Sequence, residues 1–202
     1  MKLKVWLAAC TLVASAAFNA LADSPKKAEH KMSPEEEAMM KAATPGAEHK
    51  KLDTMVGTWS ATVKMWPAPG APAQESKGTA TNKWVLGGRY LEQSFDGSFM
   101  GMPFHGTGYT GYDNIKKEYI GSWMDTMSTG MMTSTGHINA DGTWTFNGSM
   151  PDPMSGKDAP FEEKVTVKDK DHHVFEMMAP GPDGKMFKMM EITYTRKAAA
   201  KK

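Results

Sequence analysis

The chain contains a single cysteine, Cys10, which lies close to the N-terminus. One thiol cannot form a disulfide within the chain, and the rest of the sequence offers no thiol nucleophile or thiolate metal ligand. An excess of charge is also missing, because 24 basic residues stand against 23 acidic ones for a formal charge of +1. This balance argues against nucleic acid as a partner, since such binding needs a concentrated basic surface.

Long apolar runs are equally scarce. The longest begins after the basic start Met1–Lys4, covers residues 5–18 with few interruptions, and is followed by Ala20-Leu21-Ala22. It is shorter than the about 20 residues of a membrane-spanning helix, and the layout is typical of a secretory signal peptide. We therefore expect residues 1–22 to be removed, leaving a periplasmic or secreted protein without stable membrane insertion.

The next segment, residues 23–46, is predicted to be a flexible leader that contains one short helix. Ser33, Pro34 and Glu36 supply a capping serine, a proline at the first helical position and a glutamate three residues after the cap. A second helical piece is expected over residues 47–55, where it would plug or flank one end of the following domain. Residues 198–202 are predicted to be a disordered tail.

Helix-length periodicity is missing between Gly57 and Arg196, where short apolar stretches alternate with polar residues and end at glycine turns. The pattern predicts strands at residues 58–66, 78–86, 89–96, 104–112, 117–125, 130–138, 143–149, 161–168, 173–179 and 186–195. About ten short strands at this spacing indicate an all-β domain over residues 47–197, closed as an antiparallel up-and-down barrel. Closure removes the exposed strand edges that favour aggregation.

The clearest alternation lies in residues 161–168. Phe161, Glu163, Val165 and Val167 share one face, which is largely apolar, whereas the intervening residues are charged or polar. This period of two predicts a strand with one face toward the barrel interior.

Two motifs at the ends of the barrel segment resemble a known group. Gly57-Thr58-Trp59 and Arg196 are similar to the Gly-x-Trp and C-terminal arginine of lipocalin-like barrels, the calycins. Residues 84–91, 101–104, 108–113, 123–125 and 190–196 resemble a bacterial family of that group, known only as a domain of unknown function. The resemblance implies a lipocalin or fatty-acid-binding type of barrel without an established activity. It also implies a structural pair in which the Arg196 guanidinium lies on the Trp59 indole.

The favoured function is binding of a small apolar or amphipathic molecule, without catalysis, because barrels of more than about eight strands can leave a cavity. Methionine and aromatic side chains would line the cavity, and inward polar groups, first Arg89 and Asp125, would orient the ligand. The candidate ligand-binding residues are Trp84, Arg89, Tyr109, Trp123, Asp125, Met189 and Glu191. No cofactor is predicted, and the sequence does not indicate an oligomeric state.

Two alternative functions remain open. The first is binding of a soft metal, copper, in the periplasm through methionine and histidine. The 19 methionines include Met100 and Met102 close to His105, and thioethers with imidazole are ligands that suit Cu(I). The other histidines give no metal-binding spacing. His172 and His173 follow a polar turn and are expected at the surface, although they lie nearest to the axial histidine of haem-binding barrels of related shape.

The second alternative is a hydrolase or isomerase that uses the cavity. The sequence has no Gly-x-Ser-x-Gly elbow, His-Glu-x-x-His pair or phosphate-binding glycine loop, so no catalytic residue is assigned. An enzyme of this kind would need a buried acid or base with a shifted pKa.

Overall fold

The computed structural model describes residues 31–198. The signal peptide expected at residues 1–22, the first part of the leader and nearly all of the expected C-terminal tail lie outside this range.

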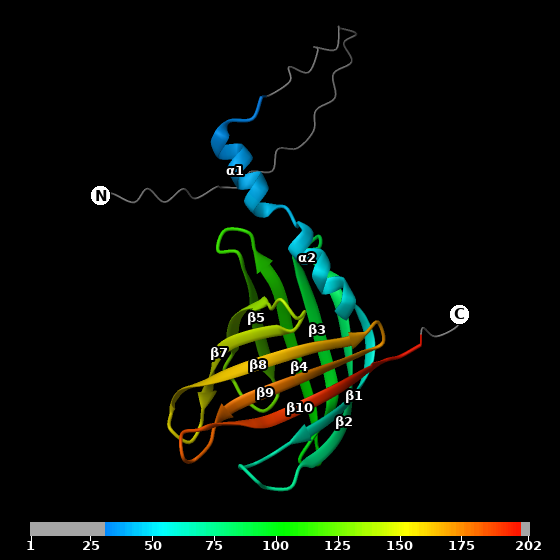
Figure 1. Ribbon diagram of the computed structural model, residues 1–202, viewed down its shortest axis with the longest axis vertical. Helices are drawn as coiled ribbons and strands as arrows, with labels where there is room; N and C mark the ends of the chain where they lie inside the picture. The colour runs from blue at the N-terminus through cyan, green and yellow to red at the C-terminus, as the bar shows by residue number, and fades with distance from the viewer. Residues whose placement is uncertain (1–30, 199–202) are drawn as a thin grey trace, which may run out of the picture.

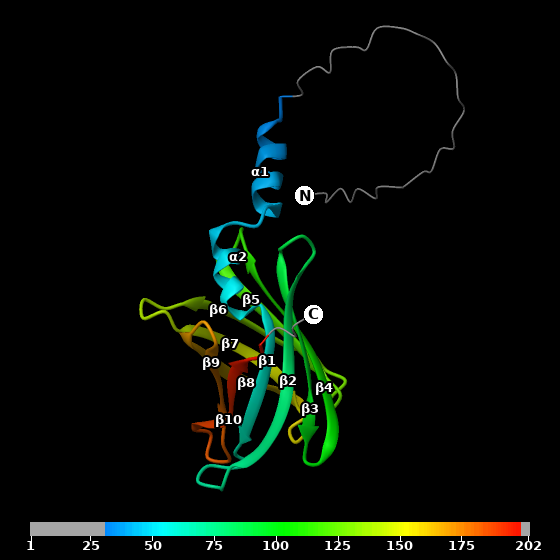
Figure 2. The same cartoon turned by 90° about the vertical axis from the view of Figure 1, so that its right-hand side faces the viewer.

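Ten antiparallel strands form a closed barrel within the described residues (Figures 1 and 2). The strands are β1 (Gly57–Met65), β2 (Gln74–Val85), β3 (Tyr90–Phe99), β4 (Met102–Asp113), β5 (Glu118–Asp125), β6 (Met132–Ile138), β7 (Trp144–Asp152), β8 (Lys157–Asp169), β9 (His172–Pro180) and β10 (Met186–Arg196). Each strand pairs with the next along the chain, and β1 pairs with β10 to close the barrel. The predicted all-β up-and-down barrel is confirmed.

Several strands are longer than the sequence pattern predicted. β8 begins at Lys157, four residues before the predicted start, because the β7–β8 ladder continues to the pair Asp152–Lys157. Pro151 and Pro160 lie inside this ladder, opposite Asp158 and Ser149 respectively. Proline removes only its own N–H donor, so pairing continues on both sides of it.

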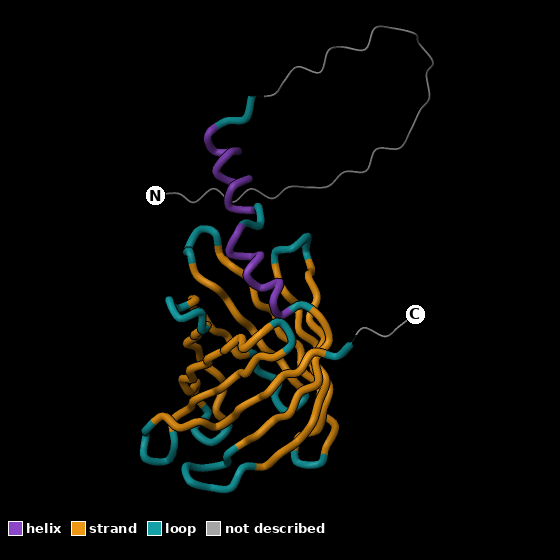
Figure 3. Tube along the Cα trace, turned by 45° about the vertical axis from the view of Figure 1, so that its right-hand side comes forward, coloured by secondary structure: helices purple, strands orange, loops and turns teal. Residues whose placement is uncertain are grey.

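Helix α1 (Pro34–Ala43) begins at the predicted cap. The Glu36 backbone N–H donates to Ser33 Oγ at 3.2 Å, and the Ser33 N–H donates to Glu36 Oε2 at 2.8 Å. α1 buries no residue and projects away from the barrel (Figure 3). Its C-terminal end is held by Asn114, whose side-chain amide donates to the carbonyl oxygens of Ala42 at 3.0 Å and Thr44 at 2.8 Å. No helix within residues 31–198 has the length and apolar character needed to cross a bilayer.

The second helical piece closes one end of the barrel, as predicted. It consists of α2 (Ala47–Lys51) and a 3-10 turn, η1 (Leu52–Met55), and Leu52 is fully buried. Trp59 Nε1 and Asn82 Nδ2 both donate to the Met55 carbonyl oxygen at 2.9 Å. These bonds fix η1 across the end of the barrel.

The implied pair of Trp59 and Arg196 is present. The Arg196 guanidinium carbon lies 4.0 Å from the centroid of the Trp59 indole ring. Arg196 Nη1 donates to the Val56 carbonyl at 2.6 Å, and a Cβ atom at Gly57 would lie only 2.5 Å from the same nitrogen. Gly57 also has a φ of 127°, which glycine adopts without a steric penalty. The Gly-x-Trp motif therefore makes room for the arginine.

A cavity inside the barrel

The barrel encloses a cavity of about 360 Å³. At one end it is bounded by Leu52 and Met55 of η1. Met65, Phe99, Met150 and Met189 line both the cavity and a recess at the opposite end of the barrel. The cavity therefore extends from η1 at the helical end to a recess at the opposite end, and three of the four residues that they share are methionines.

Most of the cavity wall is apolar. Its methionine, phenylalanine and tryptophan residues are Met55, Met65, Phe95, Phe99, Phe104, Trp123, Met127, Met132, Trp144, Phe146, Met150, Phe161, Phe175, Met177, Met189 and Met190. Methionine side chains adapt to irregular spaces and to varied ligand shapes. The cavity wall thus contains the methionine and aromatic side chains that the sequence predicted.

Two glycines of β4 create the space for the Trp123 indole. A Cβ atom at Gly106 would lie 2.1 Å from Trp123 Cζ2, and one at Gly108 would lie 2.8 Å from Trp123 Cε3. The indole therefore lies close against the backbone of the neighbouring strand. Sequence reasoning gave these glycines no role, although a glycine inside a strand is a signal of close packing.

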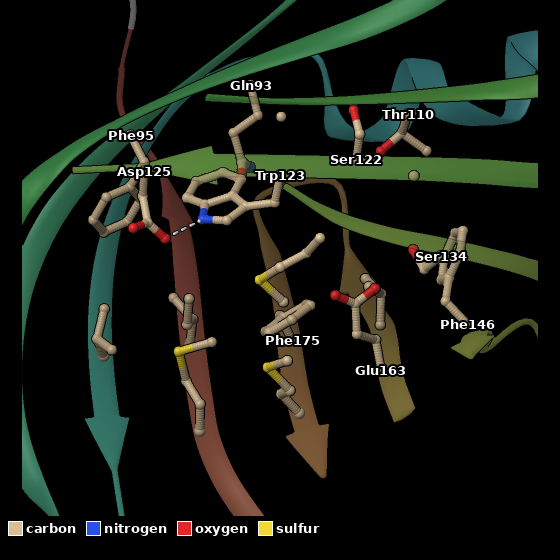
Figure 4. A pocket seen from close by; sticks show the side chains of 18 of the residues that line it. Gln93, Phe95, Thr110, Ser122, Trp123, Asp125, Ser134, Phe146, Glu163 and Phe175 are labelled. Carbon is tan, nitrogen blue, oxygen red and sulfur yellow. Dashed lines mark hydrogen bonds between the residues drawn. The ribbon is translucent and has the colours of Figure 1, made fainter. Parts of the chain in front are cut away.

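Asp125 lies on the same strand as Trp123, and each of its two oxygens accepts a hydrogen bond from the protein. Its Oδ2 accepts a hydrogen bond from Trp123 Nε1 at 2.9 Å, and its Oδ1 accepts one from the Met127 N–H at 2.9 Å. Figure 4 shows this pair on one side of the pocket. The carboxylate holds the indole and closes the turn after β5.

Glu163 lies on the other side of the pocket, near Ser134 (Figure 4). The residues opposite it on the two flanking strands are Phe146 of β7 and Met177 of β9, both apolar. Burial raises the pKa of Glu163 to about 7, and hydrogen bonding with Ser134 acts in the opposite direction. The alternation of residues 161–168 placed Glu163 on the inward face, but no functional role was assigned to it.

His173 is buried in the barrel, so the expectation that it lies at the surface is wrong. Its ring stacks on Tyr194 with centroids 4.4 Å apart and meets the Trp59 ring edge-on, also at 4.4 Å. Burial lowers the pKa of His173 to about 4, and the charge of Arg196 adds to this effect. Adjacent strand residues point to opposite faces, so His172 is exposed, where it pairs with Asp169.

Four of the seven predicted ligand-binding residues border the cavity: Tyr109, Trp123, Asp125 and Met189. The polar group of Tyr109 is engaged elsewhere, because its hydroxyl donates to Glu92 at 3.0 Å. Glu92 in turn forms an ion pair with Lys83 at 2.9 Å.

The other three predicted residues do not line the cavity. Trp84 donates from Nε1 to Asp53 at 2.8 Å and packs at the helical end. Arg89 is exposed after the turn between β2 and β3, and Glu191 forms an ion pair with Lys188. The expectation that Arg89 orients a ligand from inside the barrel is therefore wrong, because Arg89 is exposed and does not line the cavity.

The methionines and histidine proposed for copper are not gathered into one site. Met100 is exposed in the turn between β3 and β4, and Met102 is about half exposed. His105 is an odd number of residues from Met102 on β4, so the two side chains point to opposite faces. His105 Nδ1 instead pairs with Asp96 at 2.9 Å. Within residues 31–198 no three His, Cys, Asp or Glu side chains gather closely enough to hold a metal ion.

Residues 44–196 match the family described as "Protein of unknown function (DUF1579)". The chain belongs to this family. The match confirms the resemblance to a barrel family without an assigned function. Curated proteins give no match to this DUF1579 chain.

Solved structures resemble this DUF1579 barrel in fold. Rv2717c from M. tuberculosis has a TM-score of 0.56 at 12% identity, covering 77% of this chain and 100% of that one. The S-type phycobiliprotein lyase CPES from Guillardia theta has a TM-score of 0.54 at 13% identity, covering 80% of this chain and 97% of that one. At such identities the likeness shows a shared fold alone.

Proposed function

We propose that this protein binds a small, largely apolar molecule inside its barrel. The observation that carries the proposal is the cavity of about 360 Å³, with its apolar wall and few polar groups. Ligand pockets measure roughly 300–1,000 Å³, so this volume suits a compact molecule better than a long lipid chain. Contact with methionine and aromatic side chains would supply most of the affinity.

We also propose that binding takes place in the periplasm or outside the cell. The support is the layout of residues 1–22, with a basic start, an apolar run and small residues before the expected cleavage point. N-terminal sequencing of the protein from fractionated cells would test this. A chain beginning at Asp23 in the periplasm or medium is expected, whereas an intact Met1 in the cytoplasm would contradict it.

One observation favours an enzyme as a second candidate. Glu163 is a buried carboxyl group whose pKa of about 7 suits general acid–base chemistry near neutral pH. The phycobiliprotein lyase among the structural neighbours is named as an enzyme, so this barrel shape is compatible with catalysis. If the ligand found in the cavity is converted by the wild type, Glu163→Gln would abolish turnover, and continued turnover by folded Glu163→Gln would contradict this role.

Filling part of the cavity should weaken binding. Ser134 lines the cavity, whereas its neighbour Thr135 is exposed on the same strand. We expect Ser134→Phe to weaken binding of a neutral probe, naphthylmethanol, at least about tenfold, because the new ring occupies the space that the probe needs. Isothermal titration calorimetry would measure the affinity.

The matched control is Thr135→Phe, which adds the same ring outside the barrel and should leave the affinity within about twofold. Circular dichroism would establish that both variants remain folded. Equal affinities of folded Ser134→Phe and wild type would contradict binding inside the barrel.

A further inference from the structure

The charges inside the cavity are unbalanced. Its wall contains two carboxyl groups, Asp125 and Glu163, but the residues that line it in the described chain include no lysine or arginine. Among the residues that line the cavity, the one histidine is His173, whose lowered pKa of about 4 keeps it neutral at physiological pH. The interior therefore has acidic groups without a cationic partner from the protein.

The two carboxyl groups differ in what they can still bind. Asp125 accepts hydrogen bonds from Trp123 and Met127, so both of its oxygens are engaged. Glu163 faces Ser134, and the side chains opposite it on the flanking strands are apolar. A carboxylate has about four acceptor positions, so Glu163, with Ser134 as its hydrogen-bond partner, retains more of them for a ligand in the cavity than Asp125 does.

We propose that the cavity selects a small apolar molecule with a cationic amine head group, whose N–H donors bind the Glu163 carboxylate. This inference rests on the proposed function and specifies its ligand class. An ammonium group would supply the positive charge that the buried carboxylate lacks, and charge-assisted hydrogen bonds are the stronger kind. The Phe146 ring on the adjacent strand adds an aromatic face of the type that attracts cations.

The same arrangement disfavours anionic amphiphiles. A fatty acid would bring a carboxylate into a space that contains two carboxyl groups and no basic side chain able to pair with it. Burying such a charge without a partner is costly. Within the described chain, the cavity therefore lacks the arginine or lysine that a binding site for a carboxylate ligand would need.

Three probes of one shape separate charge from size: naphthylmethylamine, naphthylmethanol and naphthoic acid. Calorimetry near neutral pH should give the tightest binding for the amine, about tenfold or more tighter than the alcohol, with the acid weakest. Glu163→Gln should remove the preference for the amine over the alcohol while leaving the affinity for the alcohol within about threefold.

Glu162→Gln is the matched control, because Glu162 is the exposed neighbour on the same strand. It should keep the wild-type order of affinities. If Glu163→Gln does not fold, Glu163→Asp provides the second test, since it keeps the charge and should keep a preference for the amine. The proposal is overturned if the acid binds as tightly as the amine, or if folded Glu163→Gln retains the amine preference.

The outcomes also distinguish the proposed ligand class from the proposed function. Binding of the alcohol without any preference for the amine would overturn the ligand class and leave the proposed function intact. Failure of all three probes to bind the wild type would overturn both.

Discussion

Replacing Arg196 by alanine is expected to lower the free energy of unfolding by about 2–4 kcal/mol. The side chain donates to the carbonyl oxygens of Val56 at 2.6 Å, Thr54 at 3.0 Å and Lys170 at 2.8 Å. It also covers the Trp59 ring at 4.0 Å. Arg196→Ala would leave these carbonyls without a donor and release η1 from the end of β10. Urea denaturation followed by circular dichroism would measure the loss.

Two controls make the Arg196 result specific. Arg196→Lys should recover only part of the stability, because one ammonium group cannot reproduce the planar fork that reaches several carbonyls. Lys197→Ala removes an exposed side chain that donates to Thr79 and should change stability by less than about 0.5 kcal/mol. Equal stabilities of Arg196→Ala and the wild type would show that the arginine does not stabilise the contact between η1 and the end of β10.

Glu163→Gln should make the protein more stable than the wild type at pH 8 by up to about 3 kcal/mol, but not at pH 4. The unfolded chain ionises Glu163 near its ordinary pKa of 4.5, whereas the barrel keeps it protonated up to about pH 7. Between these values the folded state binds more protons. The stability associated with the protonated form is therefore complete below pH 4.5 and is lost as the pH rises to about 7. Glutamine cannot ionise and avoids this loss.

The contribution of His173 to stability has the opposite pH dependence. The effect of Glu163 must therefore be measured as the difference in stability between Glu163→Gln and the wild type. Its pKa is about 4 in the barrel against an ordinary 6.5, so its contribution is complete above pH 6.5 and lost as the pH falls to about 4. In the wild type the two effects largely cancel between pH 4.5 and 6.5. Subtracting the wild-type curve from that of Glu163→Gln removes the His173 contribution. A difference that does not change with pH would show that Glu163 is not held in a buried site.

The barrel itself was predictable because its determinants are local. Alternation marks each strand, glycine turns separate them, and the Ser33 and Glu36 cap fixes the start of α1. Closure followed from the number of strands and from the lack of helix-length periodicity between Gly57 and Arg196. Even the contact between Trp59 and Arg196 was implied by a short motif at each end of the barrel segment.

The inward polar residues were harder to predict, because alternation fails at turns and bulges. Arg89 follows the Gly87-Gly88 turn, where no strand periodicity defines its direction. In β10 the register shifts between Lys188 and Met190. Such a bulge changes which residues face inward, so Met189 lines the cavity although Glu191 does not.

Glu163 and His173 show a different limit. Both lie on regular strands, and Glu163 was placed on the correct face. Their properties come from burial and from neighbours on other strands, such as Ser134 near Glu163 and Tyr194 against His173. A glutamate within the apolar face of a strand was the available signal, and it pointed to the residue that now anchors the proposed ligand.

Native mass spectrometry of the protein purified from its own cells without denaturation tests the central proposal most directly. The account predicts that wild type carries a small organic molecule, released on unfolding, and that folded Ser134→Phe carries none. A bare wild-type mass, or the same bound mass on both proteins, would contradict the proposal that this barrel holds its ligand inside.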